Sequence, residues 1–252
     1  MSKDWTKIRA KVKDFIESEI YPKETELAKG TPEAREMLGS LMQLAKDEKI
    51  WALGHPEDIG GGGMPFMEYV YVNEVIGRSS FAMVALGTHS LQDSIMLREF
   101  ASAHWRDQYL EPLVQGEIFP SFGMTEPDVA SSDPTQLQTT AILDNGTWKI
   151  NGTKWFTTGA ARAAYTTVMC RTELDAPSHG AFSMIIVPTD NPGYKIVRET
   201  PVLGINGGHY EVKYDNVEVP EENLLGPRGQ GFIIAQKRLG PGRIFHCMRW
   251  LG

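Results

Sequence analysis

The strongest constraint on the fold is that the spacing of apolar residues changes twice along the chain. Up to about Gln115, apolar residues recur every three or four positions, as in helices buried on one side. From Ile118 to about Pro220 they alternate every second position between turn residues, which is typical of β-strands. Helical spacing resumes at Gly229. We therefore expect an α+β, multidomain chain with a helical domain at 1–117, a strand-rich domain at 118–228 and the start of a second helical domain at 229–252.

The N-terminal region has several helix signals. An amphipathic stripe begins at Trp5, and we expect Pro22 to close that helix. Thr31 followed by Pro32 is a typical helix start, with a capping hydroxyl and a proline at the first helical position. Four glycines then interrupt the pattern at Gly60–Gly63. Three further helices are predicted, at Met67–Gly77, Phe81–Phe100 and Ser102–Gln115, and the second is apolar enough to be buried.

The strand-rich region contains a clear hairpin signal. Leu137–Leu143 leads into Asp144-Asn145-Gly146 and returns through Trp148–Ile150. An Asn-Gly pair between alternating apolar residues favours a tight two-residue turn. Further short strands at this spacing indicate a small barrel or sandwich, with candidates at Tyr165–Cys170, Ala181–Val187, Tyr194–Val197 and Glu211–Tyr214.

The last helical stripe has no stop signal. Phe232–Leu251 keeps helical spacing, but Leu251-Gly252 has neither a proline stop nor a convincing cap. We expect the chain to be truncated inside or just after this helix. The alternative is a C-terminal helix that docks on the first domain.

Composition and charge disfavour some classes of binding partner. The 252 residues carry a net charge of −7, with 41% hydrophobic and 23% charged residues, as in ordinary globular proteins. The acidic balance disfavours nucleic acid or an anionic membrane as the main partner. Cys170 and Cys247 form no metal or disulfide motif, so we expect buried thiols in a reducing compartment. We see no targeting segment and no membrane-length apolar run, and expect a cytoplasmic protein.

Several enzyme classes lack their motifs here. The sequence has no H-E-x-x-H, no G-x-S-x-G and no G-x-x-x-x-G-K-[ST]. Gly60–Gly63 falls between helices and not after a strand, so an interhelical loop is favoured over a phosphate site. The histidines are scattered. His209 is the most interesting of them, but it has no partner at metal-ligand spacing.

Two short segments gather most of the remaining chemistry. Phe122–Ser132 is dense in Thr, Glu, Asp and Ser, and Trp155–Gly159 sets an indole beside two hydroxyls. Neither looks like a core strand, and polar groups on loops and strand ends often hold a ligand. Apolar surface with a few donors suits a flat heterocycle such as a flavin. On composition alone, a capped turn plus a hairpin with a surface Trp is equally acceptable.

Taken together, these segments resemble the paired signature of the acyl-CoA dehydrogenase family. The T-E-P-x-x-x-S motif stands at Thr125–Ser131, and the N-G-x-K motif opens Asn151–Gly159. The resemblance covers essentially all of the chain and continues through Asn73–Gly77, Pro192–Tyr194, Val217–Leu225 and Gly229–Phe232. Two segments further resemble the subgroup of family members ten and eleven, namely Gly208–Glu211 and Arg238–Arg243.

The resemblance implies a flavoprotein oxidoreductase of fatty acid beta-oxidation and lipid metabolism. Such an enzyme uses FAD to introduce an α,β double bond into an acyl-CoA thioester, with hydride transfer to flavin N5 and reoxidation by an electron-transfer flavoprotein. It implies a helical domain, a middle β-barrel domain and a C-terminal helical bundle, in a homodimer or homotetramer. In a eukaryote, the mitochondrial matrix or peroxisome is a second possible location.

Two further functions fit the same resemblance. The first is a flavin-dependent oxidase or monooxygenase of this fold, which would pass electrons to dioxygen. The second is a non-catalytic two-domain remnant that binds a ligand or partner.

Site residues follow from the resemblance by position. Phe122, Met124 and Thr125 would meet the flavin pyrimidine side, while Trp155, Phe156 and Thr157 would flank the ring and reach N5. Substrate contacts are implied at Ser131 and at Gly240, Pro241, Gly242 and Arg243.

No catalytic base is assigned within the chain. The resemblance places the base in the C-terminal domain, and a minority of the family places a Glu where this chain has Gly242. It gives Glu126 a local structural role. No metal site is expected, and we expect this chain to be inactive alone.

Overall fold

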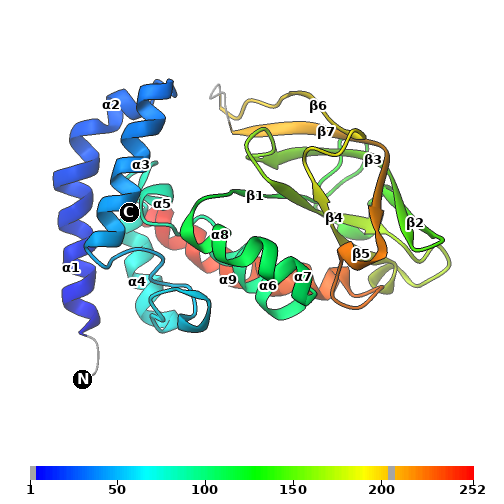
Figure 1. Ribbon diagram of the computed structural model, residues 1–252, viewed down its shortest axis with the longest axis horizontal. Helices are drawn as coiled ribbons and strands as arrows, with labels where there is room; N and C mark the ends of the chain where they lie inside the picture. Colours follow the sequence, from blue (N-terminus) through cyan, green and yellow to red (C-terminus); the bar gives the residue numbers. More distant parts are fainter. Residues whose placement is uncertain (1–3, 204–207) are drawn as a thin grey trace. The chain divides into compact units, whose positions relative to one another are not determined.

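The computed structural model describes residues 4–203 and 208–252. The chain divides into two compact units, each considered by itself. The helical unit takes in the chain up to Ile95, Leu110–Gly116 and Arg238–Gly252, and the sheet unit takes in Met96–Tyr109 and Glu117–Lys237. Figure 1 shows the N-terminal helices in blue and cyan and the strands in green to orange. The order of helices followed by a sheet confirms the α+β class.

The first helical segment runs further than Pro22. α1 (Trp5–Phe15) is capped by the Asp4 carboxylate and continues as a π-helical turn, Ile16–Ile20. A 3₁₀ turn, Tyr21–Lys23, then leads into α2 (Glu24–Leu27). The expected stop at Pro22 is wrong because proline is tolerated in the first turn of a new helical segment, where its missing N–H is not needed.

The remaining helices agree with the sequence in part. α3 (Pro32–Asp47) begins after Thr31, whose hydroxyl caps the Ala34 N–H. α4 (Phe66–Ile76) lies within one residue of the prediction. The predicted helix at Ser102–Gln115 is instead α7 (Ala103–Trp105), a π turn (Arg106–Leu110) and α8 (Glu111–Gln115).

The predicted continuous helix Phe81–Phe100 is also wrong. The chain forms α5 (Ala82–Ala85), leaves helical geometry, and forms α6 (Leu91–Phe100). Gly87 stands in the gap with φ +66°, and a Cβ there would lie 2.5 Å from the Trp51 ring. Glycine alone combines that backbone angle with so close an approach. The expected burial of this segment is confirmed, since Ala82, Ala85, Leu86, Leu91, Met96 and Leu97 are buried.

One apolar core holds the helical unit together. It joins α1, α3 and α4 with the segment Ile50–Leu53 and with Phe245 of α9 (Gly231–Leu251). Trp51 is the link to α8, because its indole N–H donates to the Val114 carbonyl over 2.9 Å. Between α1 and α4, the Arg9 guanidinium pairs with the Glu74 carboxylate.

The sheet unit has eight strands in the order β6-β7-β3-β2-β4-β5-β8 among the described residues, with β1 paired to β4. The strands are β1 (Pro120–Gly123), β2 (Thr140–Asp144), β3 (Thr147–Thr158), β4 (Tyr165–Arg171), β5 (Phe182–Pro188), β6 (Tyr194–Glu199), β7 (His209–Pro220) and β8 (Leu224–Leu225). The hairpin prediction is confirmed, since β2 and β3 pair across Asp144 and Thr147, with Asn145 and Gly146 at positive φ.

The sheet is open and not the closed barrel that the resemblance implies. Its described pairings run as a path whose end strands, β6 and β8, do not pair with each other. The joint between β2 and β4 is a single residue pair, Thr140 with Arg171. β1 explains this, because it occupies β4 from Tyr165 to Val168 and leaves only the far end for β2.

Both polar segments also belong partly to the sheet. Phe122 and Gly123 end β1, which the sequence pattern did not reveal as a strand. Trp155–Thr158 forms the last part of β3. The expectation that neither segment is a core strand is therefore wrong for these residues.

None of the helices in the described parts of the chain has the length and apolar character needed to cross a membrane.

Candidate functional site

The fold joins the two polar segments through their backbones. The Trp155 N–H donates to the Thr125 carbonyl over 3.0 Å. In return, the Thr125 hydroxyl donates to the Trp155 carbonyl over 2.7 Å. This reciprocal pair ties the loop after β1 to the end of β3. Residues separated by thirty positions are thereby held in one fixed arrangement.

A bulge in β3 turns the aromatic side chains at this point. The register between β3 and β7 shifts between Lys154 and Thr157. Phe156 sits in the bulge at φ +49°, a conformation that L-residues rarely adopt, and its side chain is 42% exposed. The Trp155 and Phe156 rings lie with centroids 4.8 Å apart. The bulge therefore places two neighbouring rings beside the Thr125 loop.

Thr157 carries a buried hydroxyl for which the described residues supply no partner. The residue itself is fully buried. A buried hydroxyl without a hydrogen bond costs on the order of 1–3 kcal/mol. Such a group in a native fold calls for an explanation, and a bound polar ligand is one.

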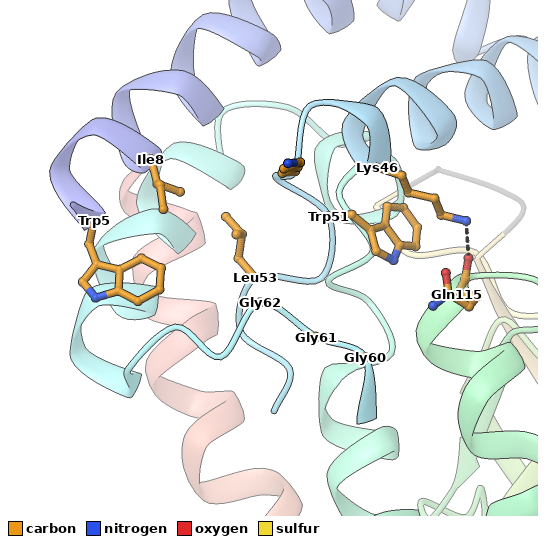
Figure 2. Close-up of a pocket in the computed structure, with 10 residues that line it drawn as sticks. Trp5, Ile8, Lys46, Trp51, Leu53, Gly60, Gly61, Gly62 and Gln115 are labelled. Carbon is orange, nitrogen blue, oxygen red and sulfur yellow. Dashed lines mark hydrogen bonds between the residues drawn. The ribbon is translucent and has the colours of Figure 1, made fainter. Parts of the chain in front are cut away.

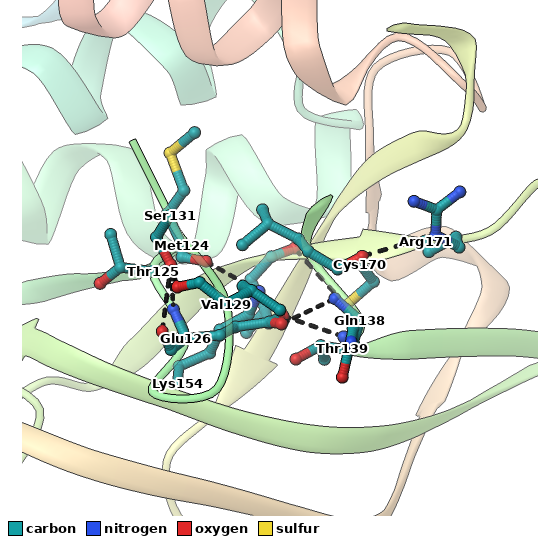
Figure 3. Close-up of polar contacts among 12 residues, drawn as sticks. Met124, Thr125, Glu126, Val129, Ser131, Gln138, Thr139, Lys154, Cys170 and Arg171 are labelled. Carbon is teal, nitrogen blue, oxygen red and sulfur yellow. Dashed lines mark hydrogen bonds and ion pairs between the residues drawn. The ribbon is translucent and has the colours of Figure 1, made fainter. Parts of the chain in front are cut away.

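A buried ion pair adjoins the Thr125–Trp155 contact. The Lys154 ammonium donates to Glu126 Oε1 over 2.8 Å and to the Met124 carbonyl over 2.9 Å. Glu126 also accepts the backbone N–H groups of Gln138 and Thr139, at 2.6 and 2.9 Å. Figure 3 shows these contacts around the Glu126 carboxylate and the Lys154 side chain. The pair therefore binds three separate stretches of chain to one another.

The surroundings of this pair favour the ionised carboxylate. Burial by itself would raise the pKa of Glu126, but the charge and hydrogen bonds of Lys154 and the backbone donors outweigh it and lower the pKa. Burial lowers the pKa of Lys154, and the attraction of Glu126 offsets part of that effect. Cys170 faces the pair, and burial raises the pKa of its thiol to about 12, so the thiol stays neutral.

The first and last parts of the T-E-P-x-x-x-S motif are hydrogen-bonded to each other. The Ser131 hydroxyl accepts the Glu126 N–H over 2.8 Å and donates to the Glu126 carbonyl over 3.1 Å. Ser131, predicted to contact substrate, is thus engaged with its own loop. Gly152 of the N-G-x-K motif also has a local reason, because a Cβ there would clash with Thr139 Oγ1.

A second polar contact borders the rings. The Thr158 hydroxyl lies 2.9 Å from His209 Nδ1. The His209 ring is also 6.3 Å from the Phe156 ring, centroid to centroid. The His209 that stood out in the sequence therefore adjoins the Trp155–Thr158 segment and extends the polar border of these aromatic residues.

Gly240, Pro241, Gly242 and Arg243 lie on α9, in the helical unit. The Gln92 side-chain amide donates to the Arg238 carbonyl, one turn before Gly242. A Cβ at Gly242 would clash with that amide nitrogen. The glycine therefore permits close packing of α9 on α6.

A separate pocket of about 430 Å³ lies within the helical unit. Figure 2 shows Trp5 and Ile8 of α1 facing Trp51, Lys46 and the glycine loop. The backbone N–H groups of the glycines all bond within the loop, to the carbonyls of Glu57, Pro56, Ala52 and His55. No amide of Gly60–Gly63 is left to cradle a phosphate, which supports the loop interpretation.

Cysteines and acidic residues offer no metal chemistry in what the structure describes. Across residues 4–203 and 208–252, no cluster of three or more His, Cys, Asp or Glu side chains is placed to hold a metal ion. Cys170 is buried as expected, whereas Cys247 is exposed on α9, so the expectation of two buried thiols is wrong for one of them.

The sequence did not reveal the role of Lys154. The residue belongs to the N-G-x-K motif, but no partner for its charge was predicted. The available signal was a lysine in the same period-two register as Trp148 and Ile150 of β3, on the buried side of the strand, where burial without a partner carries a high cost. A search for a carboxylate in the T-E-P-x-x-x-S motif would have pointed to Glu126.

Comparisons with known proteins agree with this architecture. Two domain models match, "Acyl-CoA dehydrogenase, N-terminal domain" at residues 2–117 and "Acyl-CoA dehydrogenase, middle domain" at residues 121–217. The probable acyl-CoA dehydrogenase FadE2 of Mycobacterium tuberculosis is 42% identical over 97% of this chain and 63% of its own length. Acyl-CoA dehydrogenase family member 10 of Mus musculus is 37% identical over 98% of this chain and 25% of its own length. The chain thus spans less than two thirds of these relatives.

Solved structures share the fold. A candidate acyl-CoA dehydrogenase from Mycobacterium abscessus superposes with a TM-score of 0.90 and 34% identity, over 98% of this chain and 66% of that one. A glutaryl-CoA dehydrogenase from Mycobacterium smegmatis in complex with FADH2 has a TM-score of 0.76 and 21% identity, over 99% of this chain and 62% of that one. Because the two domain models together match most of its residues, the chain belongs to the acyl-CoA dehydrogenase family, near family member ten.

Proposed function

We propose that this chain supplies the flavin-holding part of an acyl-CoA dehydrogenase, and that the whole protein dehydrogenates an acyl-CoA thioester between its α and β carbons. The observation that carries the proposal is the paired Thr125–Trp155 contact beside the unpartnered hydroxyl of Thr157. FAD, when bound, supplies the acceptor for the hydride that leaves the β carbon.

The residues present fit a flavin. A flat polar heterocycle needs apolar contact on its faces and a few hydrogen-bonding groups at its edges. Trp155 and Phe156 offer the apolar surface, with Phe122 and Met124 on the neighbouring segment. Thr157 offers a hydroxyl that has no partner among the described residues. Thr125 differs, because its proton is already donated to Trp155, so it must rotate to donate to a ligand.

Substrate contacts and partners are proposed at the family level. Ser131 and Gly240–Arg243 would contact the acyl-CoA, within a domain plan of 1–117, 118–228 and 229–252. An electron-transfer flavoprotein would reoxidise the flavin, and the whole protein would be a homodimer or homotetramer acting in fatty acid beta-oxidation. Its location would be the cytoplasm, or the mitochondrial matrix or peroxisome in a eukaryote.

The base that removes the α-proton is not proposed within this chain. The acid–base step needs a group with raised proton affinity in a dry site. Glu126 does not qualify, because Lys154 and two backbone N–H groups lower its pKa and occupy its oxygens. We therefore expect weak FAD binding and no dehydrogenation by these 252 residues.

Flavin titration tests the cofactor. When FAD binds the chain, the visible absorption bands of the flavin should become more finely resolved, and the tryptophan fluorescence of the protein should be quenched. Trp155→Ala should weaken both effects, whereas Trp250→Ala, which removes an indole that is 85% exposed on α9, should not. Identical titrations of wild type and Trp155→Ala would contradict the assignment.

The reaction is tested in a full-length relative whose matching segment has been replaced by these 252 residues, by titration with acyl-CoA. The bound flavin should bleach with acyl-CoA and recover with an electron-transfer flavoprotein. Rapid recovery in air alone would favour a flavin-dependent oxidase.

A further inference from the structure

We propose that Glu126 and Lys154 are positioning residues for the flavin: their buried ion pair fixes the Met124–Glu126 backbone against β3 and thereby sets where Thr125 and Trp155 lie. The inference rests on the proposed function and adds residues that touch no part of the cofactor in that proposal.

Lys154 connects the two halves of the Thr125–Trp155 contact. It immediately precedes Trp155, and its ammonium donates to the carbonyl of Met124, which immediately precedes Thr125. The same ammonium bonds to Glu126, which immediately follows Thr125. Thr125 is therefore held on both sides by the residue that adjoins Trp155. A displacement of Lys154 would move both halves of the contact.

Both members of the pair are buried. The side chains of Lys154 and Glu126 are 0% and 5% exposed. Water is therefore a poor substitute for either partner, and a charge left alone in this site is strongly disfavoured. An ion pair elsewhere on β3 contrasts with this, since Lys149 and Asp144 are both about half exposed, at 47% and 54%. Of these two pairs, only the buried one can constrain the backbone in this way.

Both carboxylate oxygens of Glu126 accept hydrogen bonds from protein groups. Its Oε1 also accepts the Thr139 N–H, and its Oε2 accepts the Gln138 N–H. The pair thus anchors the far end of the loop as well as its start. A carboxylate with its oxygens filled by protein donors is suited to holding structure and not to exchanging protons with a substrate. Its position beside the aromatic pair Trp155–Phe156 makes it a support for that surface.

Hydrogen exchange tests the positioning without any ligand. In Lys154→Met, the Trp155 amide, which bonds to the Thr125 carbonyl, should exchange at least about tenfold faster, equivalent to about 1.4 kcal/mol. The Trp148 amide, in the part of β3 that pairs with β7 without a register shift, should change much less. Lys149→Met, the same substitution at an exposed site on this strand, should leave Trp155 unchanged. Equal acceleration of both amides would overturn the inference, because it would indicate general loosening.

Flavin binding tests the consequence. Lys154→Met should raise the FAD dissociation constant by about tenfold or more, and the visible absorption bands of the bound flavin should become less resolved. Lys149→Met should cause neither change. Lys154→Met combined with Glu126→Gln removes the unpaired charge and keeps an acceptor for the loop, so it should recover part of the loss.

The variants separate the two proposals. If Lys154→Met does not fold, Glu126→Gln and the double variant test the positioning role instead. Unchanged Trp155 amide exchange and unchanged FAD affinity in a folded Glu126→Gln protein would overturn the positioning role and leave the proposed function standing. Absence of FAD binding by the wild type would overturn the proposed function, and with it the flavin part of this inference, whatever the exchange data show.

Discussion

At the scale of single residues, Thr157 is one of several buried groups without a hydrogen-bond partner among the described residues, and it is the one that lies in the Trp155–Thr158 segment. It is fully buried, and its hydroxyl has no partner among the described residues. A side chain kept for stability alone would be better served by valine, which has the same shape and no orphan polar atom. A ligand would complete its hydrogen bonding if the residues that cover the hydroxyl move aside on binding, because none of its surface is exposed.

Thr157→Val should therefore separate stability from binding. Without FAD, we expect the free energy of unfolding to stay the same or rise, because an unsatisfied hydroxyl is removed. FAD affinity should fall by about 0.5–1.5 kcal/mol, or roughly two- to twelvefold. Urea unfolding and FAD titration measure the two effects.

Thr166→Val is the matched control. Its hydroxyl lies 2.9 Å from the buried Tyr194 hydroxyl, so the variant should lose stability by about 1–3 kcal/mol. A Thr157→Val protein that is destabilised as much as this control would contradict the ligand explanation.

The Glu126–Lys154 pair predicts a change in pH dependence. In the wild type the Glu126 pKa is lowered from 4.5, so its contribution to stability is present above that pH and is lost as pH falls through the lowered value. In Lys154→Met, the charge and hydrogen bond of Lys154 are lost and the Cys170 thiol is neutral. Burial, the largest single effect, is then opposed by the Gln138 and Thr139 donors, and we expect the Glu126 pKa to rise above its ordinary value. Its contribution is then present at low pH and is lost as pH rises through the raised value.

Urea unfolding from pH 7 to pH 4 checks this sign. At pH 7, Lys154→Met should be less stable than wild type by about 3–5 kcal/mol, since an unpaired buried charge remains. The difference in unfolding free energy between the variant and wild type should become smaller as pH falls and Glu126 becomes protonated. The double variant with Glu126→Gln should show no such change, and a constant difference in the single variant would rule out the mechanism.

At the scale of elements, backbone geometry explains where the sequence pattern misleads. Apolar spacing alone predicts one helix from Phe81 to Phe100, but the indole of Trp51 occupies the space that a regular helix would need at Gly87. The helix divides there, and Gly87 adopts φ +66°. β3 behaves similarly, because its bulge at Phe156 breaks the two-residue period just where the aromatic side chains are needed.

Gly87→Ala should show the cost of that geometry. The added methyl group meets the Trp51 ring at 2.5 Å in an unfavourable backbone conformation, so we expect a loss of about 2–3 kcal/mol in unfolding free energy. Gly39→Ala, within α3 and with nothing near its Cβ, should instead gain up to about 1 kcal/mol. Thermal unfolding of both variants gives the comparison, and equal shifts would contradict the packing argument.

At the scale of the whole molecule, the chain has two compact units with separate cores. One core gathers the helices around Ile16, Leu41 and Val75, and the other gathers the strands around Trp148, Val168 and Tyr214. The Thr125–Trp155 contact and the Glu126–Lys154 pair lie within the sheet unit. Ligand binding there should therefore be visible in the unfolding of that unit.

FAD should stabilise the folded protein by mass action. At a concentration one hundred times its dissociation constant, a ligand that binds only the native state adds about 2.7 kcal/mol. Unfolding monitored by the near-ultraviolet signal should shift accordingly, and Trp155→Ala at the same FAD concentration should shift less. No shift at saturating FAD would mean that the flavin does not bind the folded chain.

The sequence by itself determined the order of helices and strands and the β2–β3 hairpin. These features depend on local period, turn chemistry and residue type, which act over a few positions. The resemblance to the family, rather than local pattern, located the residues now proposed to hold FAD, including Thr125, Trp155 and Thr157. The local pattern did not reveal β1, because a four-residue strand ending in glycine has too short a pattern.

Only the tertiary structure decided the long-range features. The single-residue joint between β2 and β4 depends on β1 occupying most of β4, and the break at Gly87 depends on where Trp51 packs. The partnership of Lys154 with Glu126 depends on burial that brings together charges 28 positions apart. Local propensity carries no information on such contacts, since their energy comes from desolvation and packing between distant segments.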